Sequence, residues 1–280
     1  MPAAPRDPEG IAAHLLLRAS PLPAAEARVL LCHILGVTRE RLAAHPQTVV
    51  AADDRRRYDQ AAARRLGGVP LAYLTGGQEF YGHHFLVSPA VLVPRPDTEL
   101  LVDTALHLLE NRPAARVLEL GTGSGCIALA IALARPDLAV LATDRSWEAL
   151  QVARANQLRL GARVQFLMAD WYEGLSGRFD LIVSNPPYIA AGDTHLPALA
   201  DEPAGALVAG ADGLDDLREL AAGAPAQLAP GGWLLLEHGY DQGPAVRDLL
   251  CQAGLHDVQT LRDLAGHERA CRGSWQARPA

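Results

Sequence analysis

The sequence predicts an α/β fold: a mostly parallel sheet of seven strands with an antiparallel hairpin at its edge, preceded by a small helical bundle. From Arg116 onward, short apolar segments typical of strands alternate with helical periodicity, which is the pattern of parallel strands joined by helices. Before residue 79, no segment alternates between apolar and polar residues as a half-buried strand does, and short helices account for residues 8–67.

The composition is that of a globular protein without a membrane segment. The chain has 280 residues, of which 49% are hydrophobic, and its formal charge is −7. Its longest apolar run, Cys126–Ala134, is far shorter than the roughly 18 residues that cross a bilayer. The N-terminus lacks the basic stretch and apolar core of a secretory signal, and the four cysteines lie far apart, as in a reducing compartment. We therefore expect a cytoplasmic protein.

The first predicted domain, residues 1–72, is helical. Ala24–Leu35 is an amphipathic helix that Gly36 ends, and Asp53–Leu66 is a second helix. The apolar face of the first helix contains Ala27, Leu30, Leu31 and Ile34. Residues 1–75 contain ten Arg against seven Asp and Glu, a net charge of +3, whereas the remainder carries −10. An acidic main body argues against a dedicated nucleic-acid-binding protein.

A predicted β-hairpin, residues 73–95, links this domain to the second one, because aromatic and β-branched residues flank Gly82. The second domain comprises residues 96–280. Its predicted strands are 117–118, 139–143, 164–168, 179–184, 233–237, 256–261 and 273–277. Helices are predicted after a glycine-rich turn that follows the first strand, at Trp147–Leu158 and around 214–228.

That glycine-rich turn contains the first functional motif. The stretch Glu119–Gly125 has glycine at every second position from Gly121, which allows a tight turn and close approach of a ligand at the start of a helix. The spacing is tighter than the G-x-G-x-x-G of dinucleotide-binding proteins. Asp144 ends the next strand, where it can accept hydrogen bonds from both hydroxyls of a ribose. Alternatively, or in addition, it caps the helix that begins near Trp147.

The second motif is Asn185-Pro186-Pro187-Tyr188, which follows a buried strand at the ligand-binding edge of the sheet. The prolines lack N–H donors and hold the turn rigid, so their carbonyls and the Asn185 side-chain oxygen form a fixed row of acceptors. Such a row suits an NH₂ group, and Tyr188 can stack on the planar group that carries it. Beside an S-adenosylmethionine pocket, the turn indicates methyl transfer to a planar amine or amide nitrogen; the alternative is an ordinary proline-rich turn.

With these motifs, the chain resembles the HemK/PrmC family, the glutamine N5-methyltransferases of peptide chain release factors, over nearly its whole length. The matching motifs are Pro70–Gly76, Phe80–Phe85, Val91–Glu99, Gly121–Gly125, Asp144, Asp170-Trp171, Asn185–Tyr188, Glu202–Leu207, Asp212–Leu214, Pro230–Gly232, Gln242 and Asp263–Arg269. Two positions depart from the family pattern: Asp97 replaces the usual Glu, and Cys271 stands where an aliphatic or basic residue is expected.

The resemblance implies a class I, Rossmann-like S-adenosylmethionine-dependent methyltransferase. It implies methylation of N5 of the glutamine in the Gly-Gly-Gln motif of class 1 release factors by a monomer, with S-adenosyl-L-methionine as donor and without a metal, direct nucleic-acid binding or a membrane. The expected catalytic residues are Asn185, Pro186 and Tyr188, and Pro187 joins them in binding the substrate. The expected cofactor-binding residues are Glu119, Gly121, Thr122, Gly123, Ser124, Gly125, Asp144, Trp171 and Asn185. Trp171 would flank the adenine or else pack in the core.

Other functions remain as alternatives. An N-methyltransferase acting on an exocyclic amine of adenine or guanine in nucleic acid would need a basic surface or aromatic base-flipping elements, whereas this chain has 5% aromatic residues. A non-catalytic cofactor-binding module would keep the same motifs, and the glycine spacing disfavours a nicotinamide oxidoreductase.

We also expect the helical domain to recognise a separate surface of the release factor. The candidate contacts are Arg55, Arg56, Arg64 and Arg65; the alternative is a solvated helix face.

Overall fold

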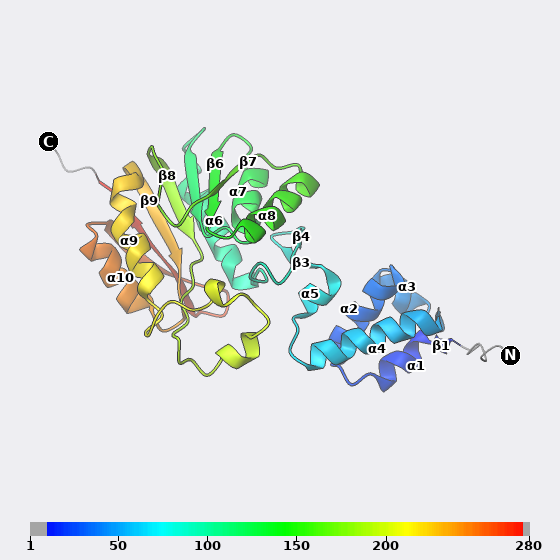
Figure 1. Cartoon of the computed structure of the whole chain (residues 1–280). Helices are drawn as coiled ribbons and strands as arrows, with labels where there is room; N and C mark the ends of the chain where they lie inside the picture. Colours follow the sequence, from blue (N-terminus) through cyan, green and yellow to red (C-terminus); the bar gives the residue numbers. More distant parts are fainter. Residues whose placement is uncertain (1–9, 277–280) are drawn as a thin grey trace. The chain divides into compact units, whose positions relative to one another are not determined.

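The computed structural model describes residues 10–276, which form two compact units that divide between Gly76 and Gly77 (Figure 1). Residues 1–9 and 277–280, the ends of the first and last predicted domains, lie outside the described part. The predicted linker, residues 73–95, therefore contributes to both units. None of the helices within residues 10–276 is long and apolar enough to cross a membrane.

The first unit is the predicted helical bundle. Its helices are α1 (Ala13–Ala19), α2 (Ala24–Leu35), α3 (Arg39–Ala44), α4 (Ala52–Leu66) and α5 (Leu71–Thr75). They bury an apolar cluster that includes Leu30 and Leu31 of α2 and Tyr58 of α4, and the Tyr58 hydroxyl donates to Ser20 Oγ at 2.6 Å. The structure adds a pair of two-residue strands, β1 (Ile11–Ala12) and β2 (Val49–Val50), to a region predicted to contain none. Two residues are too few to show strand alternation.

The second unit begins with the predicted hairpin, which is confirmed. Its strands β3 (Gly77–Phe80) and β4 (His83–Leu86) pair antiparallel, and the two residues between them, Tyr81 and Gly82, both have positive φ, as a tight hairpin turn requires. Phe80 and Phe85 are buried with their rings edge to face at a centroid distance of 6.0 Å. The hairpin is thereby anchored in the core of the second unit.

The sheet of the second unit has the seven strands that the sequence predicts. They are β5 (Arg116–Leu120), β6 (Ala139–Asp144), β7 (Val164–Met168), β8 (Phe179–Ser184), β9 (Leu228–Glu237), β10 (His256–Arg262) and β11 (Glu268–Ser274). Their spatial order is β10-β11-β9-β8-β5-β6-β7, and β11 runs antiparallel to both of its neighbours. The remaining neighbours pair in parallel, so the edge hairpin is confirmed too.

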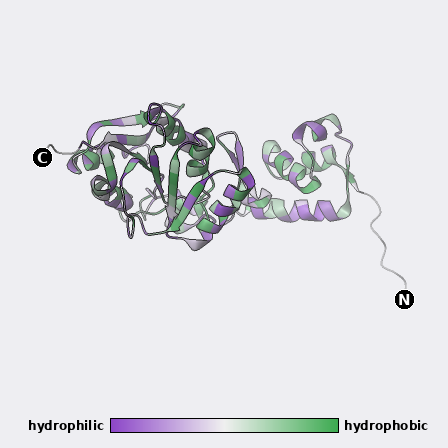
Figure 2. Cartoon of the chain, turned by 90° about the horizontal axis from the view of Figure 1, so that it is seen from above, coloured by the Kyte–Doolittle hydropathy of each residue, from purple (hydrophilic) through white to green (hydrophobic). Residues whose placement is uncertain are grey.

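Helices cover both faces of this sheet. They are α6 (Glu99–Leu108), α7 (Cys126–Ala134), α8 (Trp147–Leu160), α9 (Asp215–Gln227) and α10 (Gly243–Gln252), with short 3-10 turns η1 (Pro96–Thr98), η2 (Leu196–Leu199) and η3 (Ala204–Ala206). Val117 and Val183 join one apolar cluster with α6 and α7, whereas Leu118 and Ile182 join another with α9 and α10. Strand residues thus alternate between two cores, and the central strands are mostly hydrophobic (Figure 2).

Two parts of the second unit differ from the prediction. Helices α6 and α10 were not predicted. The last strand, predicted at 273–277, is found at Glu268–Ser274, and residue 277 lies outside the described part. The charged residues of this strand interrupt the alternation of apolar and polar residues that predicts a strand. They pair across the hairpin, Glu268 with Arg262 and Arg272 with Gln259, the latter at 2.8 Å. Polar pairing of this kind is typical of a strand near a sheet edge.

Candidate active site

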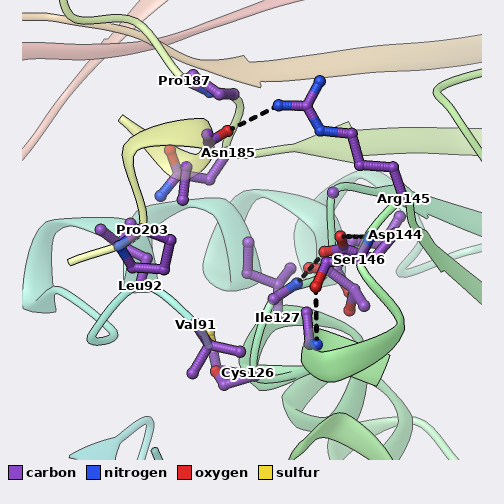
Figure 3. A pocket seen from close by; sticks show the side chains of 18 of the residues that line it. Val91, Leu92, Cys126, Ile127, Asp144, Arg145, Ser146, Asn185, Pro187 and Pro203 are labelled. Atoms are coloured by element: carbon purple, nitrogen blue, oxygen red, sulfur yellow. Dashed lines mark hydrogen bonds between the residues drawn. The ribbon is translucent and has the colours of Figure 1, made fainter. Parts of the chain in front are cut away.

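A pocket lies at the carboxyl ends of β5, β6 and β8 (Figure 3). The glycine-rich turn after β5, the end of β6 and the turn after β8 form its polar side. Segment 90–95 and residues 203–206 contribute apolar walls, including Val91, Leu92 and Pro203. The fold therefore brings together residues that the sequence separates by more than a hundred positions, at the edge where parallel α/β sheets bind ligands.

The glycine-rich turn has the left-handed backbone that its sequence predicts. Gly121, Gly123 and Gly125 have φ values of +71°, +55° and +81°. A Cβ at Gly121 would lie 3.2 Å from the Trp171 ring, whereas one at Gly123 would meet no atom within 4 Å. Gly121 is thus required for packing. The open space over Gly123, next to the N-terminus of α7, leaves room for a ligand to approach the backbone.

Glu119 supports this turn from below. Its side chain is buried, and its Oε2 accepts hydrogen bonds from the Thr122 hydroxyl and from the Ala128 N–H at 3.1 Å. Burial raises the pKa of Glu119 to about 8, because the carboxylate loses hydration that these donors only partly replace. Glu119 also borders the pocket, so it holds the loop in shape and presents a polar group to a ligand.

This pKa makes the stability of the protein depend on pH. Since the folded-state pKa of Glu119 lies above its ordinary value of 4.5, the folded protein holds a proton that the unfolded chain releases between these pH values. The free energy of unfolding should therefore fall as pH rises from about 5 to about 8, by a few kcal/mol, since one pKa unit corresponds to about 1.4 kcal/mol. Urea unfolding of wild type and Glu119→Gln across this range measures the effect. If the free energy of unfolding changed with pH by the same amount in both proteins, this prediction would be wrong.

Asp144 binds two backbone N–H groups at the edge of the pocket. Its Oδ2 accepts from Gly123 at 2.8 Å and its Oδ1 accepts from Ser146 at 2.9 Å (Figure 3). The alternative that Asp144 caps α8 is wrong, because Ser146 is the N-cap and its Oγ accepts from the Ala149 N–H at 3.1 Å. Each carboxylate oxygen retains a second acceptor site, so Asp144 can still receive two hydroxyl groups of a ligand.

Trp171 serves both the core and the pocket. Its side chain is 9% exposed and packs in the cluster on the α9 face of the sheet, and it also borders the pocket beside Gly121. Its backbone has a φ of +41°, an uncommon value for a non-glycine residue that costs of order 1–3 kcal/mol. The fold therefore holds this indole at the pocket wall in spite of backbone strain.

The Asn-Pro-Pro-Tyr turn presents two of its four residues to the pocket. Asn185 and Pro187 line it, whereas Pro186 and Tyr188 are not among the lining residues. The Asn185 amide donates from Nδ2 to Thr98 Oγ1 at 3.2 Å, which orients the amide and directs Oδ1 away from this contact. Within residues 10–276, no protein donor binds the carbonyl oxygens of Pro186 or Pro187.

Tyr188 supports the turn from outside the pocket. Its ring packs against the cluster that contains α9 and α10, and its hydroxyl donates to Glu237 Oε1 at 3.4 Å. Its carbonyl oxygen accepts from Gln242 Nε2 at 2.9 Å, and a Cβ on Gly213 would lie only 2.4 Å from the same oxygen. The family motifs at Gly213 and Gln242 therefore hold the end of the turn in place.

Sequence reasoning assigned no role to several residues that shape the site. Thr98 orients Asn185, as described above. The buried carboxylate of Glu202 accepts from the Val93 N–H at 3.0 Å and forms an ion pair with Arg95, which joins segment 91–95 to the loop at 202–206. The family motifs named above include Thr98, Arg95 and Glu202. The roles of these residues, however, depend on contacts between distant segments of the chain.

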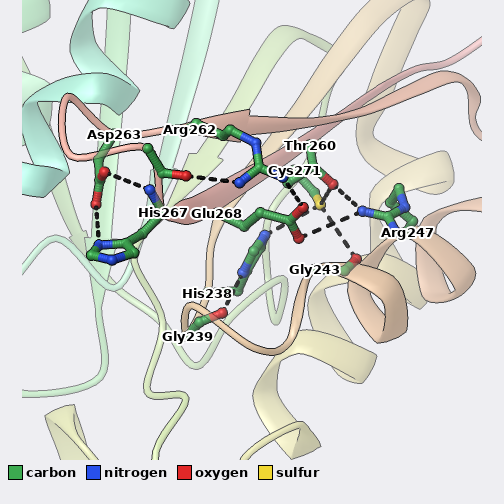
Figure 4. Close-up of polar contacts among 11 residues, drawn as sticks. His238, Gly239, Gly243, Arg247, Thr260, Arg262, Asp263, His267, Glu268 and Cys271 are labelled. Carbon is green, nitrogen blue, oxygen red and sulfur yellow. Dashed lines mark hydrogen bonds and ion pairs between the residues drawn. The ribbon is translucent and has the colours of Figure 1, made fainter.

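A polar cluster surrounds Cys271 on the edge hairpin (Figure 4). The buried Cys271, which stands where an aliphatic or basic residue is expected, has its Sγ 3.3 Å from His238 Nε2 and 3.3 Å from Thr260 Oγ1. Burial raises the pKa of this thiol to about 11 and lowers that of His238. Among residues 10–276, no three His, Cys, Asp or Glu side chains are grouped to hold a metal ion.

Most of the arginines proposed as contacts on the first unit are already in ion pairs. Arg56 pairs with Asp53, Arg55 lies 3.7 Å from Asp59, and Arg65 lies 2.7 Å from Glu26. Arg64 is exposed and forms no ion pair within the described residues. Arg64 is thus the member of this group whose charge is free for a partner.

Comparison with known proteins places the chain in a family. Its residues 11–76 match the PrmC N-terminal domain, and residues 96–206 match the methyltransferase small domain. A release factor glutamine methyltransferase from Bordetella pertussis is 55% identical over 256 residues, which cover 90% of this chain and 95% of that relative. The chain belongs to the release factor glutamine methyltransferase family. The Escherichia coli family member is 43% identical over 263 residues, which cover 92% of this chain and 95% of the relative.

A solved structure has the same fold as the second unit. A methyltransferase from Pyrococcus furiosus matches with a TM-score of 0.54 and 20% identity, covering 78% of this chain and all of that chain. At this identity the match shows the fold alone, which is that of a class I methyltransferase. The predicted fold class and the family resemblance are both confirmed.

Proposed function

We propose that this chain methylates the side-chain amide nitrogen, N5, of the glutamine in the Gly-Gly-Gln motif of class 1 peptide chain release factors. The methyl donor is S-adenosyl-L-methionine, and the reaction takes place in the cytoplasm on a single copy of the chain, without a metal or nucleic acid. The observation that supports this most directly is the oriented Asn185 amide beside the glycine-rich turn. Relatives that carry the name release factor glutamine methyltransferase cover most of the chain.

The residues on the β5–β6 side of the pocket fit the donor. Asp144 has two remaining acceptor sites for the ribose hydroxyls, and the apolar walls with Trp171 suit the adenine. The open space over Gly123 accommodates a ligand against the backbone. When bound, S-adenosylmethionine supplies an electrophilic methyl group on a sulfonium.

The turn after β8 activates and positions the target nitrogen. An amide nitrogen is a weak nucleophile because its lone pair is delocalised into the carbonyl. Acceptors for both of its N–H hydrogens raise the electron density on nitrogen and fix its direction, and we assign this task to Asn185 Oδ1 and the adjacent proline carbonyl oxygens. Positioning and electrostatics then provide most of the rate acceleration.

No carboxylate of the turn itself acts as a base in this proposal. Residues 185–188 contain none, and the nitrogen becomes acidic only after it has received the methyl group and a positive charge. The proton therefore leaves after the transfer. The apolar walls at Val91, Leu92 and Pro203 limit the water that would otherwise compete for the acceptors.

A methylation assay with two substrates tests the proposal. Purified chain is incubated with labelled S-adenosylmethionine and either an intact class 1 release factor or a short Gly-Gly-Gln peptide, and the product is sequenced by mass spectrometry. We expect the glutamine to gain the mass of one methylene group. A Gly-Gly-Glu peptide, which lacks the NH₂ group, is the control. Methyl incorporation at another residue, or into nucleic acid only, would overturn the proposal.

The first unit is proposed to recognise a second surface of the folded release factor. It contains none of the pocket residues, and one glutamine side chain offers too little surface to distinguish a release factor from other proteins. Arg64, exposed and unpaired within the described residues, is the first candidate contact.

Removing the first unit tests whether it contributes to recognition of the release factor or to the methyl transfer itself. A chain that begins at Gly77 keeps both cores of the second unit, so it should bind S-adenosylmethionine normally. We expect its kcat/KM to fall by about tenfold or more on the intact release factor, as after loss of about 1.4 kcal/mol of contact, and to change little on the peptide. Equal losses on both substrates would show that the first unit only stabilises the second.

A further inference from the structure

Two arginines line the pocket, and they start from different parts of it. Arg145 follows Asp144 at the end of β6 (Figure 3). Arg95 lies on the side of the turn after β8, because the Thr98 N–H donates to the Arg95 carbonyl at 3.1 Å and Thr98 Oγ1 accepts from Asn185 Nδ2 at 3.2 Å. The methyl transfer described above uses neither positive charge.

A buried carboxylate holds the Arg95 guanidinium in place. Arg95 Nη2 donates to Glu202 Oε1, and Glu202 Oε2 accepts from the Val93 N–H at 3.0 Å. The Glu202 side chain is 2% exposed and is not among the residues that line the pocket, whereas the Arg95 side chain is 39% exposed and lines it. The planar guanidinium is thus fixed from behind, while its remaining face is open to the pocket.

The Arg95 guanidinium has donors left for a ligand. Within residues 10–276, Nη2 is the atom of this group that bonds to the protein, so the N–H groups of Nε and Nη1 keep their donor capacity. A guanidinium has five N–H donors in a fixed fork, and its best partner is an anion that accepts two of them at once. Arg95 therefore suits a carboxylate or a phosphate group in the pocket.

The methyl donor has one group that such a cation attracts. S-adenosylmethionine carries two positive charges, on its sulfonium and its ammonium group, and one negative charge, on its carboxylate. A guanidinium attracts the carboxylate and repels the other two groups. With the ribose at Asp144 after β6 and the adenine beside Trp171 after β7, the amino-acid part of the donor extends toward β5 and β8, the side on which Arg95 lies.

We propose that Arg95, held by Glu202, binds the carboxylate of S-adenosylmethionine. This inference rests on the proposed function, because it concerns the methyl donor of the same reaction. It gives Arg95 a role in selectivity as well as in affinity. A nucleoside that lacks the carboxylate would leave the guanidinium without an anionic partner, so the pocket distinguishes the donor from other compounds that contain adenosine.

Calorimetric titration with two matched ligands tests the proposal. S-adenosylhomocysteine keeps the carboxylate of the donor, whereas its decarboxylated analogue keeps the ammonium group and lacks the carboxylate. Neither ligand has a methyl group to transfer, so binding is measured without turnover. For Arg95→Gln, we expect the Kd for S-adenosylhomocysteine to rise by about 10- to 100-fold and the Kd for the analogue to stay within about threefold of the wild-type value.

Two further variants make the result specific. Because Arg95→Gln leaves Glu202 buried without its counter-ion, the double variant Arg95→Gln/Glu202→Gln removes both charges, and it should show the same dependence on the ligand. Arg145→Gln is the matched control, because it removes the other arginine of the pocket. It should keep the wild-type ratio of the two Kd values. Urea titration shows that each variant is folded under the assay conditions.

The outcomes separate this inference from the proposed function. If wild type methylates the release factor but folded Arg95→Gln and the double variant keep the wild-type ratio of the two Kd values, the role of Arg95 is wrong and the proposed function stands. Loss of this ratio in Arg145→Gln alone would assign the carboxylate to the other arginine and leads to the same conclusion. If wild type binds neither ligand and methylates neither the release factor nor the peptide, both proposals fail.

Discussion

Replacing Asn185 with alanine should abolish methyl transfer and leave S-adenosylmethionine binding nearly intact. The variant loses the side-chain oxygen that orients the substrate nitrogen, and the Thr98 hydroxyl loses its donor at 3.2 Å. Because this contact is made in the reacting geometry, the loss should appear in kcat, by about 1000-fold, comparable to removal of one oxyanion-stabilising donor. Steady-state kinetics on the release factor, with calorimetric titration of the cofactor, measure both effects.

Two further variants make this result specific to the amide. Asn185→Asp keeps an acceptor oxygen but cannot donate to Thr98, so it should also be severely impaired. The exposed Asn111, outside the pocket, gives a matched control, and Asn111→Ala should turn over at the wild-type rate. Near-normal turnover by Asn185→Ala would show that the acceptor arrangement at this turn does not carry the reaction.

The Asp144→Ala variant should lose most of its affinity for S-adenosylmethionine. The carboxylate binds Gly123 and Ser146 at 2.8 and 2.9 Å, so its removal both frees the glycine-rich turn and deletes the proposed ribose contacts. Two hydrogen bonds to a charged acceptor are worth about 1.5–3 kcal/mol each, so the Kd should rise by about 100-fold or more. Calorimetric titration gives the Kd directly.

Two controls test whether the Asp144→Ala result comes from lost surface charge or from unfolding. Asp241→Ala removes an exposed carboxylate outside the pocket and should leave the Kd unchanged. A urea titration shows whether Asp144→Ala remains folded under the assay conditions. Wild-type cofactor affinity in folded Asp144→Ala would exclude this carboxylate from the binding site.

The fold could be predicted where a pattern is long enough to show its period. Helix α2 and strand β8 have the predicted bounds because their apolar residues follow a helical face and a continuous buried strand. The two-residue strands β1 and β2 carry no period at all. Strand β11 was placed too late because its charged residues make cross-strand pairs, which a local pattern does not reveal.

In the candidate site, too, local patterns could be predicted from the sequence, whereas contacts between distant segments could not. The glycine-rich turn, Asp144 and Asn185 could be found because each stands directly after a predicted strand, and strand ends meet at one edge of a parallel sheet. Thr98 could not, because its contact with Asn185 joins residues 87 positions apart. Tyr188 was expected to face the substrate, but its hydroxyl reaches Glu237, 49 positions later, outside the pocket.

In the proposed mechanism, the row of acceptor oxygens at the turn after β8 limits how many methyl groups the enzyme adds. An unmodified glutamine amide has two N–H hydrogens, one for each of two acceptors. After one transfer the nitrogen keeps a single hydrogen, and an acceptor of the turn then faces a methyl group. An unsatisfied acceptor in a water-poor site costs about 1–3 kcal/mol, so the mono-methylated side chain is held more weakly than the substrate. In this proposal, the same geometry that selects a primary amide favours release after one turnover and makes monomethylglutamine the end product.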